Sequence, residues 1–234
     1  MRNIVISGGS KGIGKAIVLK YAAEGNNIFI SSRNEKFLRK TAEEIGGIFP
    51  QSSIKYLASD LSKNQDAIRF SDFIFQNNGT PDVLVNNAGT FLPGSIYNEN
   101  EGTLEEMIEN NLYSAYYLTR ALLPLMMENK SGHIFNVCSI ASLKAYANGG
   151  SYSISKFALM GFSKNLREEL KPHLIKVTSV YPGAVYTDSW AGAGIDEKSI
   201  IQASDIAELI YTASKLSAAA CVEEIVVRPI GGDI

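Results

Sequence analysis

The residues best placed to do chemistry are a tyrosine and a lysine in the middle of the chain. Tyr152 and Lys156 stand four positions apart in a segment with a helical pattern, and side chains at that spacing share one helix face. A phenol has a pKa of about 10, and a positive charge about 4 Å away favours the phenolate by roughly 4 kcal/mol at an effective dielectric constant of about 20. The spacing predicts a general acid and base whose pKa lies close to working pH. A lysine packed over an aromatic ring in any long helix would have the same spacing.

A glycine-rich turn near the N-terminus is the first element that could position such a pair. The β-branched run Asn3–Ser7 predicts a strand that is buried on both faces. It precedes residues 8–14, Gly-Gly-Ser-Lys-Gly-Ile-Gly, and a helical pattern that continues to about Gly25. Free backbone N–H groups and the helix dipole face a turn of this kind, so it predicts a phosphate site.

Three phosphate-binding motifs can be compared with this turn. A P-loop needs Ser or Thr at the position of Ala16 to hold magnesium, and alanine has no oxygen. The strict dinucleotide pattern needs a third glycine or alanine where Ile17 stands. The spacing Gly8-x-x-x-Gly12-x-Gly14 is typical of another dinucleotide-binding group, and we expect this motif to apply.

The end of the second expected strand, residues 27–31, bears on which dinucleotide is bound. A carboxylate there would hold a ribose 2′-hydroxyl, but the chain continues Ser31-Ser32-Arg33. Arg33 and Lys11 offer two cations where a 2′-phosphate would lie, which favours NADP(H) over NAD(H). A solvated arginine at the start of a helix is the alternative interpretation of Arg33.

Strand and helix patterns alternate along the whole chain. Further strands are expected at 53–58, 83–85, 133–137, 174–181 and 224–227, and helices at 34–45, 64–76, 103–127, around Tyr152 as far as Pro172, and at 203–216. This alternation predicts an α/β fold with a doubly wound parallel sheet of about seven strands and helices on both faces, the Rossmann fold. No linker, repeat or change of composition interrupts the pattern, so one domain over residues 1–234 is expected.

Polar residues follow several of these strands, at the edge where open α/β sheets bind ligands. Asp60 comes after the third strand, Asn86-Asn87-Ala88-Gly89 after the fourth, and Ser139 after the fifth. Asn111 lies within the expected helix 103–127, where asparagine has a poor propensity. A functional role and a hydrogen-bonded structural role explain Asn111 equally well.

The substrate side of the site is less well defined. Residues 184–200 are expected to form a mobile substrate loop, because they are rich in glycine and alanine around Trp190. Apolar and aromatic residues near the expected strand ends are pocket candidates and indicate a hydrophobic portion of the substrate, although core packing explains several of them equally well. They are Phe91, Leu92, Ile140, Tyr146, Tyr186 and Trp190.

Composition excludes several classes of protein. The 234 residues are 45% hydrophobic and 20% charged with a net charge of -2, which does not favour nucleic acid or a polybasic membrane contact. No apolar run reaches the roughly 18 residues of a membrane span, and a strand pattern from Asn3 leaves no room for a signal peptide, so a cytoplasmic location is expected. Cys138 and Cys221 are expected to be buried, reduced thiols. His133 and His173 are far apart in sequence, and no metal site is expected.

Taken together, these motifs resemble the short-chain dehydrogenase/reductase family over essentially the whole chain. Each motif is weak alone, but their order and intervals are specific. The matching residues are Ser7-Gly8-x-x-x-Gly12-x-Gly14, Asp60, Asn86-Asn87-Ala88-Gly89, Asn111, Ser139, Tyr152-x-x-x-Lys156, Pro182-Gly183 and Thr187. Ser7 replaces the usual threonine of the family and keeps its hydroxyl.

The resemblance implies a catalytic role for four residues. Tyr152 would donate and accept the proton, while Lys156 would lower its pKa and bind the nicotinamide ribose. Ser139 would orient and polarise the substrate carbonyl, and Asn111 would hold a water that connects Lys156 to solvent.

The resemblance also implies a set of cofactor contacts. Asp60 would contact the adenine, Asn87 and Gly89 the adenosine side, and Val185 and Thr187 the nicotinamide amide. Further cofactor contacts are expected from Gly8, Ser10, Lys11, Gly12, Ile13, Gly14, Arg33, Leu61, Ala88, Pro182 and Gly183.

The sequence thus predicts an NADP(H)-dependent oxidoreductase that transfers hydride between nicotinamide and a ketone or aldehyde, or a secondary alcohol in reverse. A 3-oxoacyl thioester and a small carbonyl compound or hydroxy acid are both candidate substrates. The alternative is a non-catalytic NADP-binding regulator or scaffold, which would not need a tuned phenol. Apolar residues on more than one face of helix 103–127 favour a homodimer or homotetramer. No nucleic acid or membrane partner is expected.

Overall fold

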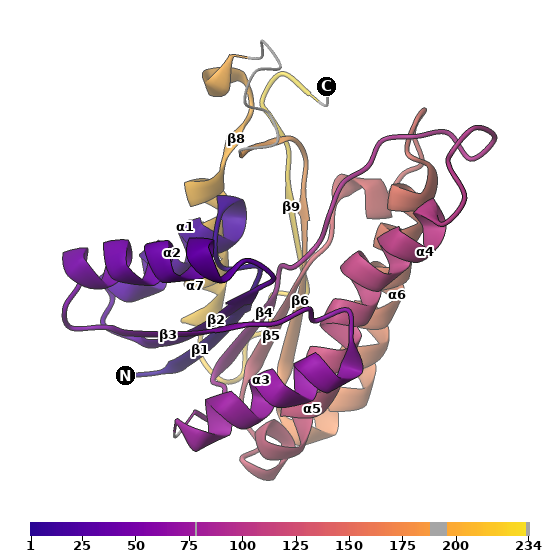
Figure 1. Ribbon diagram of the computed structural model, residues 1–234. Coiled ribbons are helices and arrows are strands. Elements are labelled where there is room, and N and C mark those ends of the chain that lie inside the picture. Colours follow the sequence, from indigo (N-terminus) through magenta and orange to yellow (C-terminus); the bar gives the residue numbers. More distant parts are fainter. Residues whose placement is uncertain (78, 188–195, 233–234) are drawn as a thin grey trace.

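A computed structural model describes residues 1–77, 79–187 and 196–232 of the protein, and its centre is one parallel sheet with helices on both sides (Figure 1). The sheet has seven strands in the order β3-β2-β1-β4-β5-β6-β9. The strands are β1 (Asn3–Ser7), β2 (Asn27–Ser32), β3 (Ser53–Ala58), β4 (Val83–Asn86), β5 (His133–Val137), β6 (Lys176–Pro182) and β9 (Glu224–Val227). The predicted doubly wound parallel sheet is confirmed.

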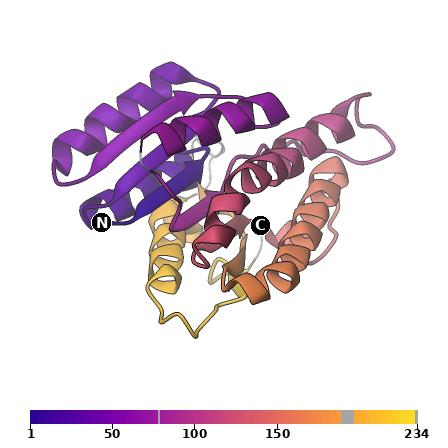
Figure 2. The same cartoon turned by 90° about the horizontal axis from the view of Figure 1, so that it is seen from below.

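The helices form one layer on each face of the sheet, and Figure 2 shows the same layers from below. On one face lie α1 (Gly12–Ala23), α2 (Glu35–Ile48) and α7 (Ala203–Ser214), and on the other α3 (Asn64–Gln76), α5 (Ser114–Glu128) and α6 (Gly150–Leu170). Strand β1 shows how both layers are held: Ile4 and Ile6 pack into the first core, and Val5 packs into the second. This explains the unbroken apolar runs in the sequence, because a strand of such a sheet is buried on both faces.

The strand order reverses direction between β1 and β4, which are neighbours in space but not in sequence. The chain leaves β1 toward α1 on one face, and it leaves β4 through residues 87–102 toward the other face. Such a switch point opens a crevice at the carboxyl ends of the strands, and ligands bind there in open α/β sheets.

The expected helix 103–127 is not regular throughout. It consists of α4 (Thr103–Ile108), a five-residue π-helical turn (Glu109–Tyr113) and α5. Asn111 lies in the middle of the π turn and is fully buried. The prediction of a single regular helix was wrong here, and π turns of this kind are frequent at functional sites.

The expected substrate loop 184–200 begins and ends in a small second sheet. Strand β7 (Val185–Tyr186) pairs in parallel with β8 (Ile201–Gln202), and a 3₁₀ turn at Glu197–Ser199 precedes β8. Residues 188–195, which include Trp190, lie outside the described residues, so the prediction of a mobile loop is not tested there.

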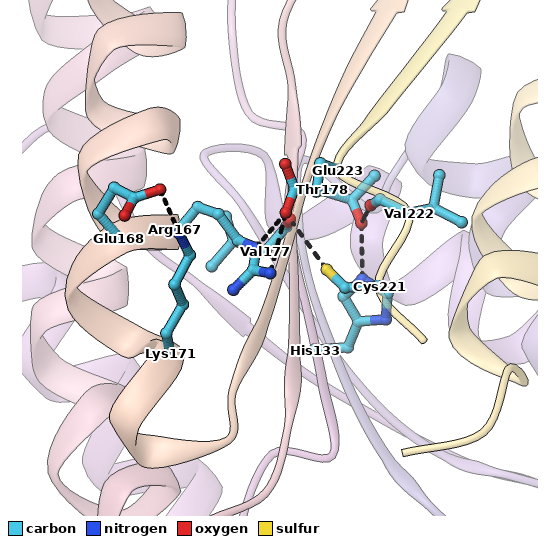
Figure 3. Close-up of polar contacts among 9 residues, drawn as sticks. All are labelled: His133, Arg167, Glu168, Lys171, Val177, Thr178, Cys221, Val222 and Glu223. Atoms are coloured by element: carbon cyan, nitrogen blue, oxygen red, sulfur yellow. Dashed lines mark hydrogen bonds and ion pairs between the residues drawn. The ribbon is translucent and has the colours of Figure 1, made fainter. Parts of the chain in front are cut away.

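Side-chain contacts hold the segment before β9 against β6, as Figure 3 shows. The Cys221 thiol donates to the Val177 carbonyl with a sulfur–oxygen distance of 3.6 Å, and the Thr178 hydroxyl donates to the Val222 carbonyl at 2.5 Å. Both cysteines are free thiols, but only Cys138 is buried, and the expectation of burial was wrong for Cys221. These contacts place the last strand of the sheet next to the strand that ends at the candidate site.

Two further features concern the described part of the chain as a whole. Across residues 1–77, 79–187 and 196–232, the helices are too short or too polar to cross a membrane. Within the same residues, no group of three or more His, Cys, Asp or Glu side chains is arranged to hold a metal ion.

Candidate active site

The Ser7 hydroxyl joins the ends of β1 and β4 at the switch point. It accepts hydrogen bonds from the backbone N–H groups of Asn87 and Ala88, each at 2.9 Å, and donates to the Val85 carbonyl at 3.4 Å. A serine supplies this oxygen as well as a threonine would. The contact fixes the spacing between the glycine-rich turn and the loop after β4.

The glycine-rich turn leaves no room for side chains where it meets this loop. A Cβ at Gly14 would lie 2.1 Å from the Gly8 carbonyl oxygen, and Gly8 itself has a φ of +69°. The Asn87 amide donates to the carbonyls of Ser7 and Gly8 at 3.1 and 3.2 Å. The turn and the N-terminus of α1 therefore present bare backbone, which fits a dinucleotide pyrophosphate.

The two predicted cations lie at the rim of this cradle. Lys11 is the N-cap residue of α1, and Arg33 follows β2; both side chains are exposed. Ser10 is fixed beside them by a 3.0 Å hydrogen bond from the Thr41 hydroxyl to its carbonyl. At the end of β3, Asp60 accepts the Ser62 N–H at 3.2 Å. This set fits the adenosine half of a nicotinamide dinucleotide with a 2′-phosphate.

The remaining predicted cofactor residues follow β6 and β3 or lie in the first turn of α1. Gly183 follows Pro182, the last residue of β6, and donates its N–H to the Val227 carbonyl at 2.8 Å. Val185 is buried, and the methyl group of Thr187 would lie 3.2 Å from a Cβ at Gly12. Ile13 is half-buried in the first turn of α1, and Leu61 is buried after β3. Their contacts with a cofactor stay predictions.

The predicted catalytic pair lies together near the start of α6. The Lys156 Nζ atom is 5.9 Å from the centroid of the Tyr152 ring and donates to the Val137 carbonyl at 3.0 Å. Burial disfavours the ammonium and lowers the pKa of Lys156 to about 8. Lys156 therefore remains mostly charged at neutral pH, although it is inside the protein.

The phenol of Tyr152 differs from the sequence-based expectation. Burial raises its pKa to about 12, and a hydrogen bond with Ser139 only partly opposes this effect. The ring packs edge-on against Phe91, with centroids 4.8 Å apart. The expectation of a pKa near neutral pH was wrong, because Lys156 directs its hydrogen bond to the Val137 carbonyl and burial has the larger effect.

Ser139 is held at the end of β5 by a short turn. Its hydroxyl accepts the Ala141 N–H at 3.1 Å, and its own N–H donates to the Ser142 hydroxyl at 3.3 Å. The Ser153 hydroxyl of α6 donates to the Ala141 carbonyl at 2.9 Å and ties this 3₁₀ turn (Ile140–Ser142) to the helix. The Ser139 side chain also forms a hydrogen bond with Tyr152.

Asn111 is joined to its neighbours through its side-chain amide. Its Oδ1 accepts the Thr90 N–H at 2.8 Å, and its Nδ2 donates to the Thr90 carbonyl at 3.0 Å and the Ser155 hydroxyl at 2.9 Å. A Cβ at Gly89 would lie 2.5 Å from Asn111 Oδ1 and 3.7 Å from Lys156 Nζ. Asn111 therefore connects the loop after β4 to α6, and its water-holding role stays a prediction.

Two predicted pocket residues lie beside the phenol, because the Phe91 ring packs against Tyr152 and Tyr146 is close enough to affect the pKa of Tyr152. Phe91 and Tyr146 are 49% and 47% exposed, Leu92 is also exposed, and Ile140 and Tyr186 are half-buried. Trp190 lies outside the described residues. Sequence analysis missed four polar residues that fix the catalytic groups, because single serines and threonines in loops and helices give no spacing signal; they are Thr90, Ser142, Ser153 and Ser155.

A parallel sheet with a glycine cradle at its switch point, beside a converging serine, tyrosine and lysine, defines a class of nicotinamide-dependent oxidoreductases. The sequence model of the short chain dehydrogenases matches residues 2–198. The chain therefore belongs to the short-chain dehydrogenase/reductase family, whose members are oxidoreductases acting on CH–OH or carbonyl groups. The predicted resemblance is confirmed.

Individual relatives cover nearly the full chain. A sepiapterin reductase from Chlorobaculum tepidum is 32% identical over 99% of this chain and 97% of its own length. An alcohol dehydrogenase from the archaeon Thermococcus sibiricus, solved with 5-hydroxy-NADP, has a TM-score of 0.90 at 28% identity over 98% of this chain and 97% of that one. A metagenomic short-chain oxidoreductase in complex with NADP has a TM-score of 0.85 at 30% identity, over 97% of this chain and 96% of that one.

Proposed function

We propose that the protein reduces a ketone or aldehyde with NADPH as the hydride donor. The observation that supports this most directly is the convergence of Ser139, Tyr152 and Lys156 next to the glycine cradle. Bound NADPH supplies the hydride, while the protein contributes orientation and the proton. A non-catalytic scaffold would not need these three groups in one place.

The protein's own residues account for the proton transfer. The Ser139 hydroxyl holds the carbonyl oxygen, and the Tyr152 O–H bond breaks as its proton moves to the developing alkoxide. A pKa of about 12 keeps this proton on Tyr152 at neutral pH, and an alkoxide is a stronger base than a phenolate, so the transfer is downhill. The Lys156 ammonium, charged below about pH 8, lies 5.9 Å from the centroid of the Tyr152 ring and donates its hydrogen bond to the Val137 carbonyl.

The cofactor preference is proposed from Lys11 and Arg33. Their exposed cations at the rim of the cradle would pair with the 2′-phosphate that distinguishes NADPH from NADH. The relatives solved with 5-hydroxy-NADP and with NADP support this preference. The corresponding test is the Lys11→Ala, Arg33→Ala double variant. Its kcat/KM with NADPH should fall by at least about tenfold, while its kcat/KM with NADH should stay unchanged.

The substrate is proposed to carry a hydrophobic portion beside its carbonyl group. The exposed rings of Phe91 and Tyr146 flank the phenol, and Leu92 extends this apolar rim. A 3-oxoacyl thioester and a small carbonyl compound both satisfy this description. The similarity to a sepiapterin reductase adds sepiapterin to the compounds to be tested.

The test of this function is a panel of these carbonyl compounds, followed by NADPH absorbance with NADH in parallel. We expect saturable turnover with at least one hydrophobic carbonyl compound and a preference for NADPH. Tight NADPH binding without turnover of any compound would instead support the regulator or scaffold.

We also propose that residues 1–234 form one catalytic domain, located in the cytoplasm, that assembles into a homodimer or homotetramer. Apolar and aromatic side chains remain exposed on the π turn, α5 and α6, where a second copy could cover them; they are Tyr113, Tyr116, Ile154 and Phe157. Light scattering should give two or four times the 25.4 kDa of the chain, and the mass of a monomer would contradict this proposal.

A further inference from the structure

A carboxylate from a distant loop caps the helix that carries the catalytic pair. Glu99 accepts the Ser151 N–H at 2.9 Å and the Ser151 hydroxyl at 2.5 Å, although 52 positions separate the two residues. Ser151 lies in the first turn of α6 and is 3% exposed. The N-cap residue of α6 is Gly149, which has no side chain to accept a hydrogen bond, and the first turn contains no acidic residue. Glu99 therefore supplies the acceptor and the negative charge that a helix N-terminus favours.

Two glycines make room for this carboxylate. A Cβ at Gly94 would lie 2.8 Å from Glu99 Cγ, and a Cβ at Gly150 would lie 2.1 Å from Glu99 Oε1. Asn148 adds two contacts, because its carbonyl accepts the Gly94 N–H at 3.1 Å and its side-chain oxygen accepts the Ser95 hydroxyl at 2.7 Å. We call these contacts between residues 94–99 and 148–151 the Glu99 clamp.

The Glu99 clamp joins the two segments that carry the phenol and its aromatic neighbour. Tyr152 follows Ser151 directly in the first turn of α6. Phe91, whose ring packs edge-on against Tyr152, lies in the same loop as Glu99. A shift of the loop relative to α6 would move the substrate rim and the phenol apart.

We propose that Glu99 is a positioning residue for carbonyl reduction. It acts through Ser151 and fixes the distance between the apolar rim at Phe91 and the proton donor Tyr152. This inference rests on the proposed function, because it assigns Glu99 to the same reaction. The glycine cradle is held by Asn87 and Ala88 at the start of this loop, whereas Glu99 contacts α6 from the other end of the loop.

The kinetic test compares three single variants with the wild type. Glu99→Ala should lower kcat/KM for the carbonyl substrate by about 10- to 100-fold, because small misplacements of a catalytic group have effects of that size. The KM for NADPH should stay within about twofold, which separates positioning of the substrate from loss of the fold. Glu99→Gln should recover to within about threefold of the wild type, since its amide oxygen still accepts the Ser151 N–H.

Glu101→Ala is the matched control, because Glu101 is an exposed carboxylate two residues further along the same loop. It should leave both kinetic constants unchanged. The proposal would be overturned if Glu99→Ala and Glu101→Ala lowered kcat/KM for the carbonyl substrate equally. It would also be overturned if Glu99→Ala raised the KM for NADPH by the same factor by which it lowers that kcat/KM.

A double-mutant cycle tests the contact itself. The three nearest heavy atoms to a Cβ at Gly94 all belong to Glu99. Gly94→Ala should therefore lower kcat/KM in the wild type but cause no further loss in the Glu99→Ala protein. Additive losses would contradict the clamp.

Hydrogen exchange distinguishes failure of this inference from failure of the proposed function. Residues 148–153 should exchange faster in Glu99→Ala and not in Glu101→Ala. Faster exchange with unchanged kcat/KM would show a clamp that does not position the reaction, and would refute the inference alone. Normal turnover of Tyr152→Phe would refute the proposed function, whatever the exchange result.

Discussion

The two ends of β5 each hold a buried base, and the two bases are in opposite states. His133, the first residue of the strand, is 4% exposed, and Lys156, bonded to the carbonyl of the last residue Val137, is 7% exposed. Burial lowers the pKa of His133 to about 3, so this residue is neutral at any working pH. Burial lowers the pKa of Lys156 only to about 8, so the ammonium persists at neutral pH.

The partners of His133 explain its neutral state. The Thr178 hydroxyl donates to the Val222 carbonyl, so the His133 Nε2 atom, 2.7 Å from that hydroxyl, must act as the donor (Figure 3). The Nδ1 atom is then the unprotonated nitrogen, and it has no hydrogen-bond partner among the described residues. The imidazole stacks on the Phe135 ring, with the ring centroids 3.9 Å apart, and a charge on the imidazole would be poorly solvated there.

The difference shows which end of the sheet is built for stability and which for chemistry. At the amino end, the protein packs a neutral imidazole into its core with one hydrogen bond, at Nε2. At the carboxyl end, it retains a buried charge beside a phenol, at a cost in folding free energy. Sites that need a charge in a low-dielectric environment accept this cost.

A polar row crosses the sheet from β4 to β6 near the carboxyl end of β5. Asn86 donates to Asn136 at 2.8 Å, Asn136 donates to Ser163 at 2.9 Å, and Ser179 donates to Ser163 at 2.7 Å. The strand residues of this row are paired in register, and Ser163 belongs to α6. The row therefore fixes how α6, which carries the catalytic pair, sits on the sheet.

The largest predicted effect is a loss of folding stability at acid pH that is caused by His133. The unfolded chain binds a proton at this residue below about pH 6.5 and the folded chain only below about pH 3, so the free energy of unfolding should fall as the pH falls through this window. The loss attributable to His133 is at most about 5 kcal/mol. Urea unfolding at pH 7, 5 and 4 measures it as the difference between the wild type and His133→Gln, which does not titrate. Identical pH dependence of both proteins would show that His133 is not buried as a neutral group.

The next largest effect is a change in folding stability at alkaline pH that is caused by Lys156. At Lys156 the unfolded chain binds more protons than the folded chain between about pH 8 and 10.5, so the contribution of this residue to the free energy of unfolding should rise with pH there by at most about 3 kcal/mol, measured as the difference between the wild type and Lys156→Met. Lys156→Met should lack this rise, be more stable than the wild type at pH 7, and lose carbonyl reduction. A variant that is less stable at pH 7 would contradict the buried charge.

A smaller effect is expected from the polar row. Asn136→Ala should lower the free energy of unfolding by about 1–3 kcal/mol, because it leaves buried partners unsatisfied. It should also lower kcat/KM several-fold, since Ser163 loses its contact with β5. Asn165→Ala on the exposed face of α6 is the matched control and should change stability by less than about 0.5 kcal/mol. Equal effects of Asn136→Ala and Asn165→Ala on stability and kcat/KM would show that the polar row does not position α6.

The sheet and its helices could be predicted because their signals are local. The predicted bounds of β1, β3, β5, β9 and α3 agree with the structure. Asn34, where the predicted helix 34–45 begins, caps α2 by accepting the Phe37 N–H at 3.1 Å. The glycine spacing marked the glycine-rich turn, and the four-residue interval from Tyr152 to Lys156 marked the catalytic pair. Both of these signals are local as well.

Features that depend on distant contacts or on burial could not be predicted. The π turn at Asn111 does not disturb the apolar pattern enough to be visible in the sequence. The raised pKa of Tyr152 depends on how deeply the phenol is buried, whereas spacing shows only which charge is near. The Glu99 clamp joins residues 52 positions apart, and a single glutamate in a loop carries no signal of its partner.

The most direct test of the account is Tyr152→Phe, which removes only the phenolic oxygen. NADPH binding, followed by cofactor fluorescence, should be unchanged, because the contacts that hold the glycine cradle do not involve the phenol. The kcat for carbonyl reduction should fall by about 10²- to 10⁴-fold, the usual contribution of a general acid. Turnover close to that of the wild type would show that another group donates the proton, and would contradict the central claim.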